Sequence, residues 1–271
     1  MSNFWGAVHS ESPFFVAARN CRAVLDSARN VYGEWKKWLF LHEIPAIMKV
    51  LLINGSPRRE GNTFIALSEA ARALEAEGVG AEIVSIGTKA VQGCIACGKC
   101  AELGRCVFND ALYNEVREKL VGADALVVGS PVYGGVMPLL VREYLAQHVT
   151  GEKTACILAA VYGNRNFDDC LVEMQDLMEE NGFVVTAAAA CIGEHSYSTA
   201  IASGRPNAQD LALAEEFGRQ VAQKLSASPA VPTLAQTLPG SRPYRERKPS
   251  APMAPQTTNG CIRCGMCVNN C

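Results

Sequence analysis

The chain has 271 residues, 49% of them apolar and 19% charged, the balance of an ordinary globular protein. Its formal net charge of −2 gives no general attraction to nucleic acid or to anionic membranes, so nucleic acid is not expected as a partner. No apolar run is long enough to span a bilayer, and the start lacks the pattern of a secretory signal. We therefore expect no transmembrane segment and a cytoplasmic location.

Residues 1–47 contain all three tryptophans and a helical pattern. Apolar side chains recur at spacings of three and four between Phe14 and Leu39, which predicts one apolar face of a helix. Two interpretations stay open, because the domain that follows looks complete without this segment. It is either an N-terminal helical extension or translated sequence upstream of a true start at Met48.

Residues 48–227 alternate short apolar runs with segments of helical periodicity, which predicts an α/β domain with a doubly wound, five-stranded parallel sheet. The expected strands cover residues 50–54, 81–86, 125–129, 154–161 and 184–190. The expected helices cover residues 63–77, 111–121, 139–148, 168–181 and 207–225.

The turn between the first strand and the first helix has the composition of a phosphate-binding loop. It reads Gly55-Ser-Pro-Arg-Arg-Glu-Gly-Asn-Thr63, and the start of the helix offers unpaired N–H groups to an anion. It matches neither the nucleoside-triphosphate loop nor the dinucleotide fingerprint. Its polar groups are the hydroxyls of Ser56 and Thr63, the amide of Asn62 and the guanidinium of Arg58, while Gly61 permits close backbone approach.

Three loops resemble those of flavodoxin-like FMN reductases and iron–sulfur flavoproteins. Asn54-Gly-Ser-Pro-Arg with Gly61-Asn-Thr63 is similar to their phosphate loop. Gly129-Ser-Pro-Val-Tyr-Gly-Gly135 follows the third strand, where such proteins hold the isoalloxazine ring, and Val161-Tyr-Gly-Asn-Arg-Asn-Phe167 follows the fourth and would close the pocket. The resemblance covers about residues 48–225 and implies a flavodoxin-like fold that binds FMN.

The expected cofactor-binding residues come from these loops. Tyr133 could cover the ring, and the turn around it could offer backbone hydrogen bonds to the polar edge of the ring. The set is Ser56, Arg58, Gly61, Asn62, Thr63, Pro131, Val132, Tyr133, Gly134, Gly135, Tyr162, Gly163 and Asn164. No catalytic acid, base or nucleophile is assigned.

A compact cysteine motif lies inside this domain. Its ligands would be Cys94, Cys97, Cys100 and Cys106, with the spacing Cys-x2-Cys-x2-Cys-x5-Cys. Zinc sites usually place a longer spacer between two cysteine pairs, so the compact form favours a 4Fe–4S cluster. The motif also resembles that of iron–sulfur flavoproteins. Zinc and redox-active thiols remain alternatives.

A second motif closes the sequence after a linker at residues 228–259, which contains seven of the chain's thirteen prolines and is expected to be a semi-extended spacer. Cys261, Cys264, Cys267 and Cys271 have the spacing of bacterial ferredoxins, but the sequence stops where a proline normally follows. Residues 260–271 thus resemble a short, truncated ferredoxin-like tail, as in flavodoxin–ferredoxin fusion proteins. Whether this tail holds a second cluster is open.

Together these features predict an iron–sulfur flavoprotein that transfers electrons between FMN and one or two 4Fe–4S clusters. The alternatives are an NAD(P)H-dependent FMN or quinone reductase without a functional cluster, and a non-catalytic electron carrier. The donor, NAD(P)H or a ferredoxin-type protein, is open. A redox protein or a small electron acceptor is the expected partner, and the resemblance implies a homo-oligomer.

Overall fold

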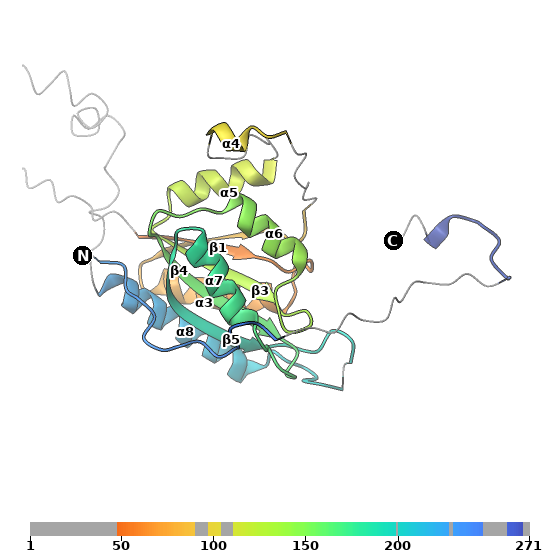
Figure 1. The fold of residues 1–271 in the computed structure, drawn as a ribbon. Helices are drawn as coiled ribbons and strands as arrows, with labels where there is room; N and C mark the ends of the chain where they lie inside the picture. The colour runs from red at the N-terminus through yellow and green to blue at the C-terminus, as the bar shows by residue number, and fades with distance from the viewer. Residues whose placement is uncertain are drawn as a thin grey trace, which may run out of the picture. The chain divides into compact units, whose positions relative to one another are not determined.

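The computed structural model describes residues 48–89, 97–103, 111–198, 200–227, 230–245 and 259–267, so the expected N-terminal helix lies outside the described residues. Five parallel strands form one sheet in the order β2-β1-β3-β4-β5 (Figure 1). This is the flavodoxin-like order, and its switch point lies between β1 and β3. The strands are β1 (Lys49–Asn54), β2 (Gly80–Ser85), β3 (Ala125–Pro131), β4 (Ala155–Tyr162) and β5 (Val184–Ile192).

Helices cover both faces of the sheet, as the alternation of elements predicts. On one face lie α3 (Asn62–Ala76) and α8 (Ala208–Ser226). On the other lie α5 (Ala111–Val121), α6 (Leu139–His148) and α7 (Cys170–Glu180), which are drawn in front of the sheet in Figure 1. A further short helix, α4 (Cys100–Leu103), falls in the first cysteine motif. The expected α/β fold with five parallel strands is confirmed.

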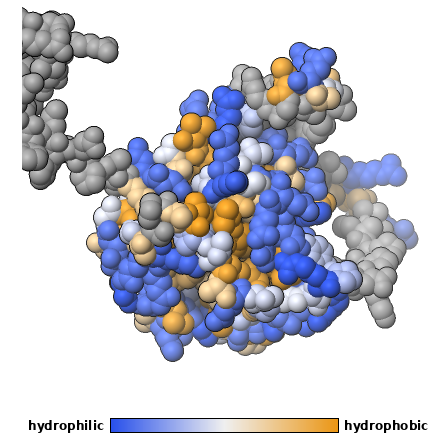
Figure 2. All heavy atoms as spheres, turned by 60° about the vertical axis from the view of Figure 1, so that its left-hand side comes forward, coloured by the Kyte–Doolittle hydropathy of each residue, from blue (hydrophilic) through white to orange (hydrophobic). Residues whose placement is uncertain are grey.

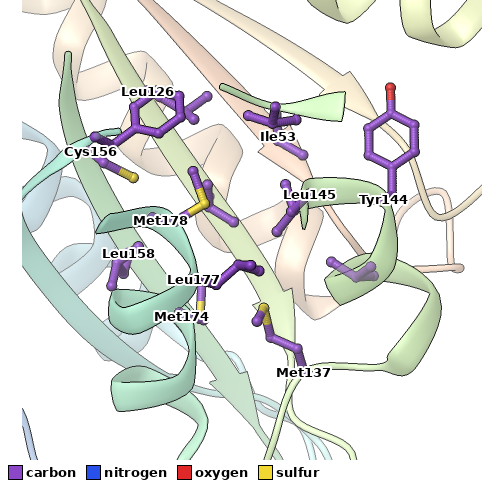
Figure 3. Packing of buried hydrophobic residues seen from close by; sticks show 14 of the residues in the cluster. Ile53, Leu126, Met137, Tyr144, Leu145, Cys156, Leu158, Met174, Leu177 and Met178 are labelled. Carbon is purple, nitrogen blue, oxygen red and sulfur yellow. The ribbon is translucent and has the colours of Figure 1, made fainter. Parts of the chain in front are cut away.

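Alternate residues of the central strands belong to two separate hydrophobic cores. Leu51 and Ile53 of β1 pack with the α5–α7 layer, whereas Val50 and Leu52 pack with α3 and α8. The first core is seen in Figure 3, where side chains of α7 lie over those of β3 and β4: Met174, Leu177 and Met178 against Leu126, Cys156 and Leu158. Because both faces are buried, these strands are continuously apolar instead of alternating with polar residues.

The closest helix contact on the α3–α8 face depends on a glycine. A Cβ atom built on Gly218 of α8 would lie 2.5 Å from the carbonyl oxygen of Ala70 and 2.9 Å from its Cα. Both atoms belong to the backbone of α3, so neither can move aside without shifting the helix. The side-chain-free surface at Gly218 therefore sets the distance between the two helices.

We expect Gly218→Ala to lower the free energy of unfolding by about 1–3 kcal/mol, through overpacking of this contact. Helix propensity alone predicts the opposite sign, a gain of about 1 kcal/mol. The matched control is Gly122→Ala, where the nearest atom to a Cβ would be the carbonyl oxygen of Lys119 at 3.8 Å. Urea unfolding of both variants checks the prediction, and equal stability of the two would contradict it.

Residues 230–245, which we call the C-terminal strap, lie against the domain beside edge strand β5 instead of forming only a spacer. The Lys224 ammonium donates to the carbonyl oxygens of Thr186 (2.5 Å) and Thr233 (3.1 Å), which joins α8, β5 and the strap. Leu238 packs against the first core. A cavity of about 540 Å³ lies between the strap, β5 and α8. The strap therefore lies alongside the edge strand β5, with this cavity between them.

Polar groups dominate the rim of the face drawn in Figure 2, and hydrophobic side chains gather towards its middle. In the part of the chain that the structure describes, no helix is both long and apolar enough to cross a membrane.

Candidate functional site

The loop after β1 is held by a buried asparagine. The Asn54 side chain accepts a hydrogen bond from the Ser56 backbone N–H (3.0 Å) and donates to the Ser85 hydroxyl at the end of β2 (3.1 Å). The N–H of Gly55 donates to the carbonyl oxygen of Gly129 in β3 (2.8 Å). The Ser56 hydroxyl in turn accepts from the N–H of Arg58 (3.2 Å). The ends of three strands thus fix the start of the predicted phosphate loop.

The N-terminus of α3 is open to an anion. Gly61 occupies the N-cap position, and within the described part of the chain no side chain caps this helix start and its first turn has no acidic residue. Gly61 is packed closely, since a Cβ there would lie 2.8 Å from the Cβ of Arg58. The first N–H groups of α3 and the positive end of its dipole are therefore free of a capping side chain from the described residues and can bind an anion.

Two further glycines bring neighbouring loops against this one. A Cβ on Gly87, after β2, would lie 2.5 Å from the carbonyl oxygen of Gly55. A Cβ on Gly193, after β5, would lie 2.2 Å from the amide nitrogen of Asn62, which donates to the carbonyl oxygen of Glu194 (3.2 Å). The sequence analysis missed both contacts. Glycine within two residues of a strand end was the available signal.

The loop after β3 contains a tight turn with two left-handed residues. The N–H of Val136 donates to the carbonyl oxygen of Tyr133 (3.4 Å), which closes a four-residue turn, and the N–H of Tyr133 donates back to the carbonyl oxygen of Val136 (2.8 Å). Its central residues, Gly134 and Gly135, have φ values of 62° and 87°. Positive φ at both central positions is the type I′ turn, which favours glycine. Tyr133 is 47% exposed at this turn, so its ring is available to a ligand.

The loop after β4 contacts both its neighbours. Tyr162 packs edge-on against Phe167, with ring centroids 5.3 Å apart. A Cβ on Gly163 would lie 2.7 Å from the imidazole carbon Cδ2 of His195, and a Cβ on Gly135 would lie 2.6 Å from the Asp168 carboxylate. Glycines at positions 135 and 163 therefore let the loops after β3, β4 and β5 close on one another.

All thirteen predicted cofactor-binding residues lie at the carboxyl ends of β1, β3 and β4, in the last strand residue, the loop that follows or the start of the next helix. This edge is where open α/β sheets bind ligands. Arg58, Tyr133, Gly134 and Asn164 are exposed, whereas Ser56, Thr63 and Gly135 are buried. Asn164 has a φ of 57°, which asparagine tolerates better than most residues. The individual roles of these residues stay predictions.

The two cysteine motifs share one local pattern, Cys-Ile-x-Cys-Gly-x-Cys, starting at Cys94 and Cys261. The shared glycine is left-handed in both, with φ of 71° at Gly98 and 77° at Gly265, and no atom lies within 4 Å of a Cβ built there. Left-handed glycine turns the chain sharply between successive thiols, and thiolates are the usual ligands of iron–sulfur clusters. The turn and the donor set therefore both fit a cluster.

Only part of each motif is described. Cys97, Cys261, Cys264 and Cys267 are exposed, and α4 begins at Cys100. Cys94, Cys106 and Cys271 lie outside the described residues. Among the residues that the structure does describe, no three histidine, cysteine, aspartate or glutamate side chains are grouped so that they could hold a metal ion.

The described cysteines outside the motifs, Cys156, Cys170 and Cys191, have a different environment. Cys156 and Cys170 are fully buried in the first core. Burial, followed by the charge of Glu179, raises the pKa of the Cys156 thiol far above its ordinary value. Burial, followed by the charge of Asp210, raises the pKa of Cys191 to about 11. The thiols of Cys156 and Cys191 therefore stay protonated near neutral pH and are poor metal ligands.

Comparison with known proteins identifies related chains. Residues 48–196 match the model of a family described as NADPH-dependent FMN reductase. An iron–sulfur flavoprotein of Methanocaldococcus jannaschii is 44% identical over 90 residues, 33% of this chain and 46% of that protein. One of Archaeoglobus fulgidus is 38% identical over 86 residues (32% and 39%), and one of Methanosarcina thermophila is 28% identical over 159 residues (55% and 80%). The chain thus spans less than half the length of the first two relatives.

Among solved structures, RosB with a bound 8-demethyl-8-formylriboflavin-5′-phosphate intermediate is similar, with a TM-score of 0.51 and 17% identity. The match covers 68% of this chain and 82% of that one. At this identity the likeness concerns the fold alone.

Proposed function

The chain belongs to the NADPH-dependent FMN reductase family, and we propose that it is a flavin-dependent oxidoreductase whose FMN exchanges electrons with a 4Fe–4S cluster at the first cysteine motif. When bound, FMN supplies two-electron chemistry and the cluster supplies one-electron transfer, so the pair can connect the two kinds of redox partner. The single observation that carries this proposal is the contact of Gly87 with the phosphate loop.

That contact supports the proposal because Gly87 begins the segment that leads to the first motif. A Cβ on Gly87 would lie 2.5 Å from the carbonyl oxygen of Gly55 and 2.6 Å from that of Ser56. The chain therefore leaves β2 at the same edge as the open start of α3, and Cys94 follows seven positions later.

One group of site residues would bind the phosphate of FMN, and another group would bind its ring. The N–H groups at the start of α3, the hydroxyls of Ser56 and Thr63 and the guanidinium of Arg58 would hold the phosphate. The turn at Tyr133–Val136 would offer its backbone to the polar edge of the ring, and the exposed Tyr133 ring would pack on one face. Because no atom of the described residues lies within 4 Å of a Cβ built on Gly134, a flat ring can approach the backbone of the turn there.

One alternative has a specific observation in its favour. The matching family is described as NADPH-dependent FMN reductase, which calls for no cluster. The relatives reported above are instead named iron–sulfur flavoproteins, and both thiol motifs keep the left-handed glycine. We therefore favour the form with a cluster.

Anaerobic purification of the full chain tests the proposal. We expect flavin absorbance with about one FMN per chain, and about four iron and four sulfide per cluster. FMN without iron or sulfide would favour the reductase alternative, and zinc without sulfide would favour a zinc site. Protein that neither retains nor rebinds FMN would overturn the proposal.

A further inference from the structure

We propose that the C-terminal strap is part of the flavin site, because Asp169 joins the strap to the glycine turn at Tyr133–Val136. Bound FMN and the docked strap would then stabilise each other. This inference rests on the proposed FMN site, and it assigns to residues 240–245 a role that neither the family match nor the relatives provide.

Asp169 contacts both partners at once. It is only 3% exposed, and its backbone N–H donates to the carbonyl oxygen of Gly135 (3.1 Å). Its two carboxylate oxygens accept from the strap, Oδ1 from the N–H of Ser241 (2.9 Å) and Oδ2 from the N–H of Arg245 (2.7 Å). A buried carboxylate that loses such donors is costly, so the strap and this carboxylate hold each other in place.

The neighbouring Asp168 also contacts both the strap and the glycine turn. Its Oδ1 accepts from the Arg245 guanidinium (3.1 Å), while its Oδ2 would lie 2.6 Å from a Cβ on Gly135. Asp168 has a φ of 42°, an uncommon conformation for a residue other than glycine. Two successive aspartates thus place the strap on one side of the loop after β4 and the glycine turn on the other.

The strap has a separate anchor on α7 that does not involve the turn. The Arg242 guanidinium donates to both carboxylate oxygens of Asp176 (2.8 and 3.2 Å), and the Tyr244 hydroxyl donates to one of them (2.6 Å). Burial opposes the charge of Asp176, but these two donors outweigh it and hold its pKa below the ordinary value. The strap can therefore stay on the domain when its link to Asp169 is cut.

Linkage makes the expected effect reciprocal. If the docked strap improves FMN affinity by some factor, FMN must improve strap docking by the same factor, typically about 5- to 150-fold for coupled sites. The effect would be transmitted over one residue, because the Asp169 N–H holds the turn and its side chain holds the strap. Residues 241 and 245 themselves need not touch the ligand.

The test uses backbone substitutions in the full chain. Ser241→Pro removes the N–H that donates to Asp169, whereas Ser241→Ala keeps it and is the matched control. FMN is titrated into flavin-free protein, and hydrogen exchange of peptides covering residues 240–245 is followed with and without FMN. We expect Ser241→Pro to raise the Kd for FMN at least about fivefold, Ser241→Ala to leave it within twofold, and FMN to slow exchange in the wild-type strap.

The inference would be overturned, and the proposed function left standing, by an unchanged Kd for FMN in Ser241→Pro. The same holds if FMN does not change the rate of hydrogen exchange in the wild-type strap. If wild-type protein binds no FMN, the proposed function fails and the inference falls with it. Asp169→Asn provides a second variant in case Ser241→Pro does not fold. Its amide cannot accept from the N–H of Arg245 through nitrogen, so it should also raise the Kd for FMN and weaken the exchange protection.

Discussion

Gly135→Ala is expected to raise the dissociation constant for FMN by at least about tenfold, which corresponds to about 1.4 kcal/mol. Two costs combine at this position. A φ of 87° is left-handed and disfavours any side chain, and the new Cβ would lie 2.6 Å from the Asp168 carboxylate. Relief requires the turn to move away from Asp168 and therefore away from its position relative to α3. Fluorescence titration of FMN into flavin-free protein measures the change.

The control separates backbone strain from displacement of the turn. Gly78 has a φ of 79°, close to that of Gly135, but no atom lies within 4 Å of a Cβ built there. Gly78→Ala should therefore lose stability through strain, about 1–2 kcal/mol, while keeping its FMN affinity. The proposed position of the ring site would be wrong if both variants bound FMN as the wild type does.

The architecture could be predicted from the sequence because it depends on short-range patterns. Continuous apolar runs such as Val50–Ile53 are typical of strands buried on both faces, and they alternate with segments of helical periodicity. Every predicted strand of the sheet is present, with ends shifted by at most two residues. The short helix α4 was missed, since four residues are too few to give a periodicity.

The positions of the site loops could be predicted from strand ends, but the contacts between loops could not. Asn62 and Glu194 are 132 positions apart, and Asp169 and Ser241 are 72 apart. Nothing in the local pattern around Ser241 distinguishes a docked strap from a proline-rich spacer. The partners are backbone groups, the carbonyl oxygen of Glu194 and the N–H of Ser241, which almost every residue carries, so their pairing depends on tertiary structure.

The second large expected effect is the loss of iron and sulfide when a cysteine of the first motif is replaced. Cys97→Ala is expected to remove about four iron and four sulfide per chain and to leave the flavin absorbance in place, because one of four thiolate ligands is lost and Cys97 is not among the predicted flavin contacts. Cys191→Ala is the matched control, a half-buried cysteine outside both motifs whose thiol has a pKa of about 11. It should keep all of the iron. Iron and sulfide assays on anaerobically purified protein decide the result, and full iron content in Cys97→Ala would contradict the assignment.

Cys264→Ala, at the equivalent position of the second motif, extends this prediction to the tail. A wild-type content of about eight iron per chain, halved by either substitution, would assign one cluster to each motif. A content of about four that falls only in Cys97→Ala would assign the cluster to the first motif alone. The left-handed glycine is common to both motifs, whereas the spacing to the fourth cysteine differs, so we expect a difference between them to come from the fourth ligand. Five residues separate that ligand from the third cysteine in the first motif, and three residues separate them in the second.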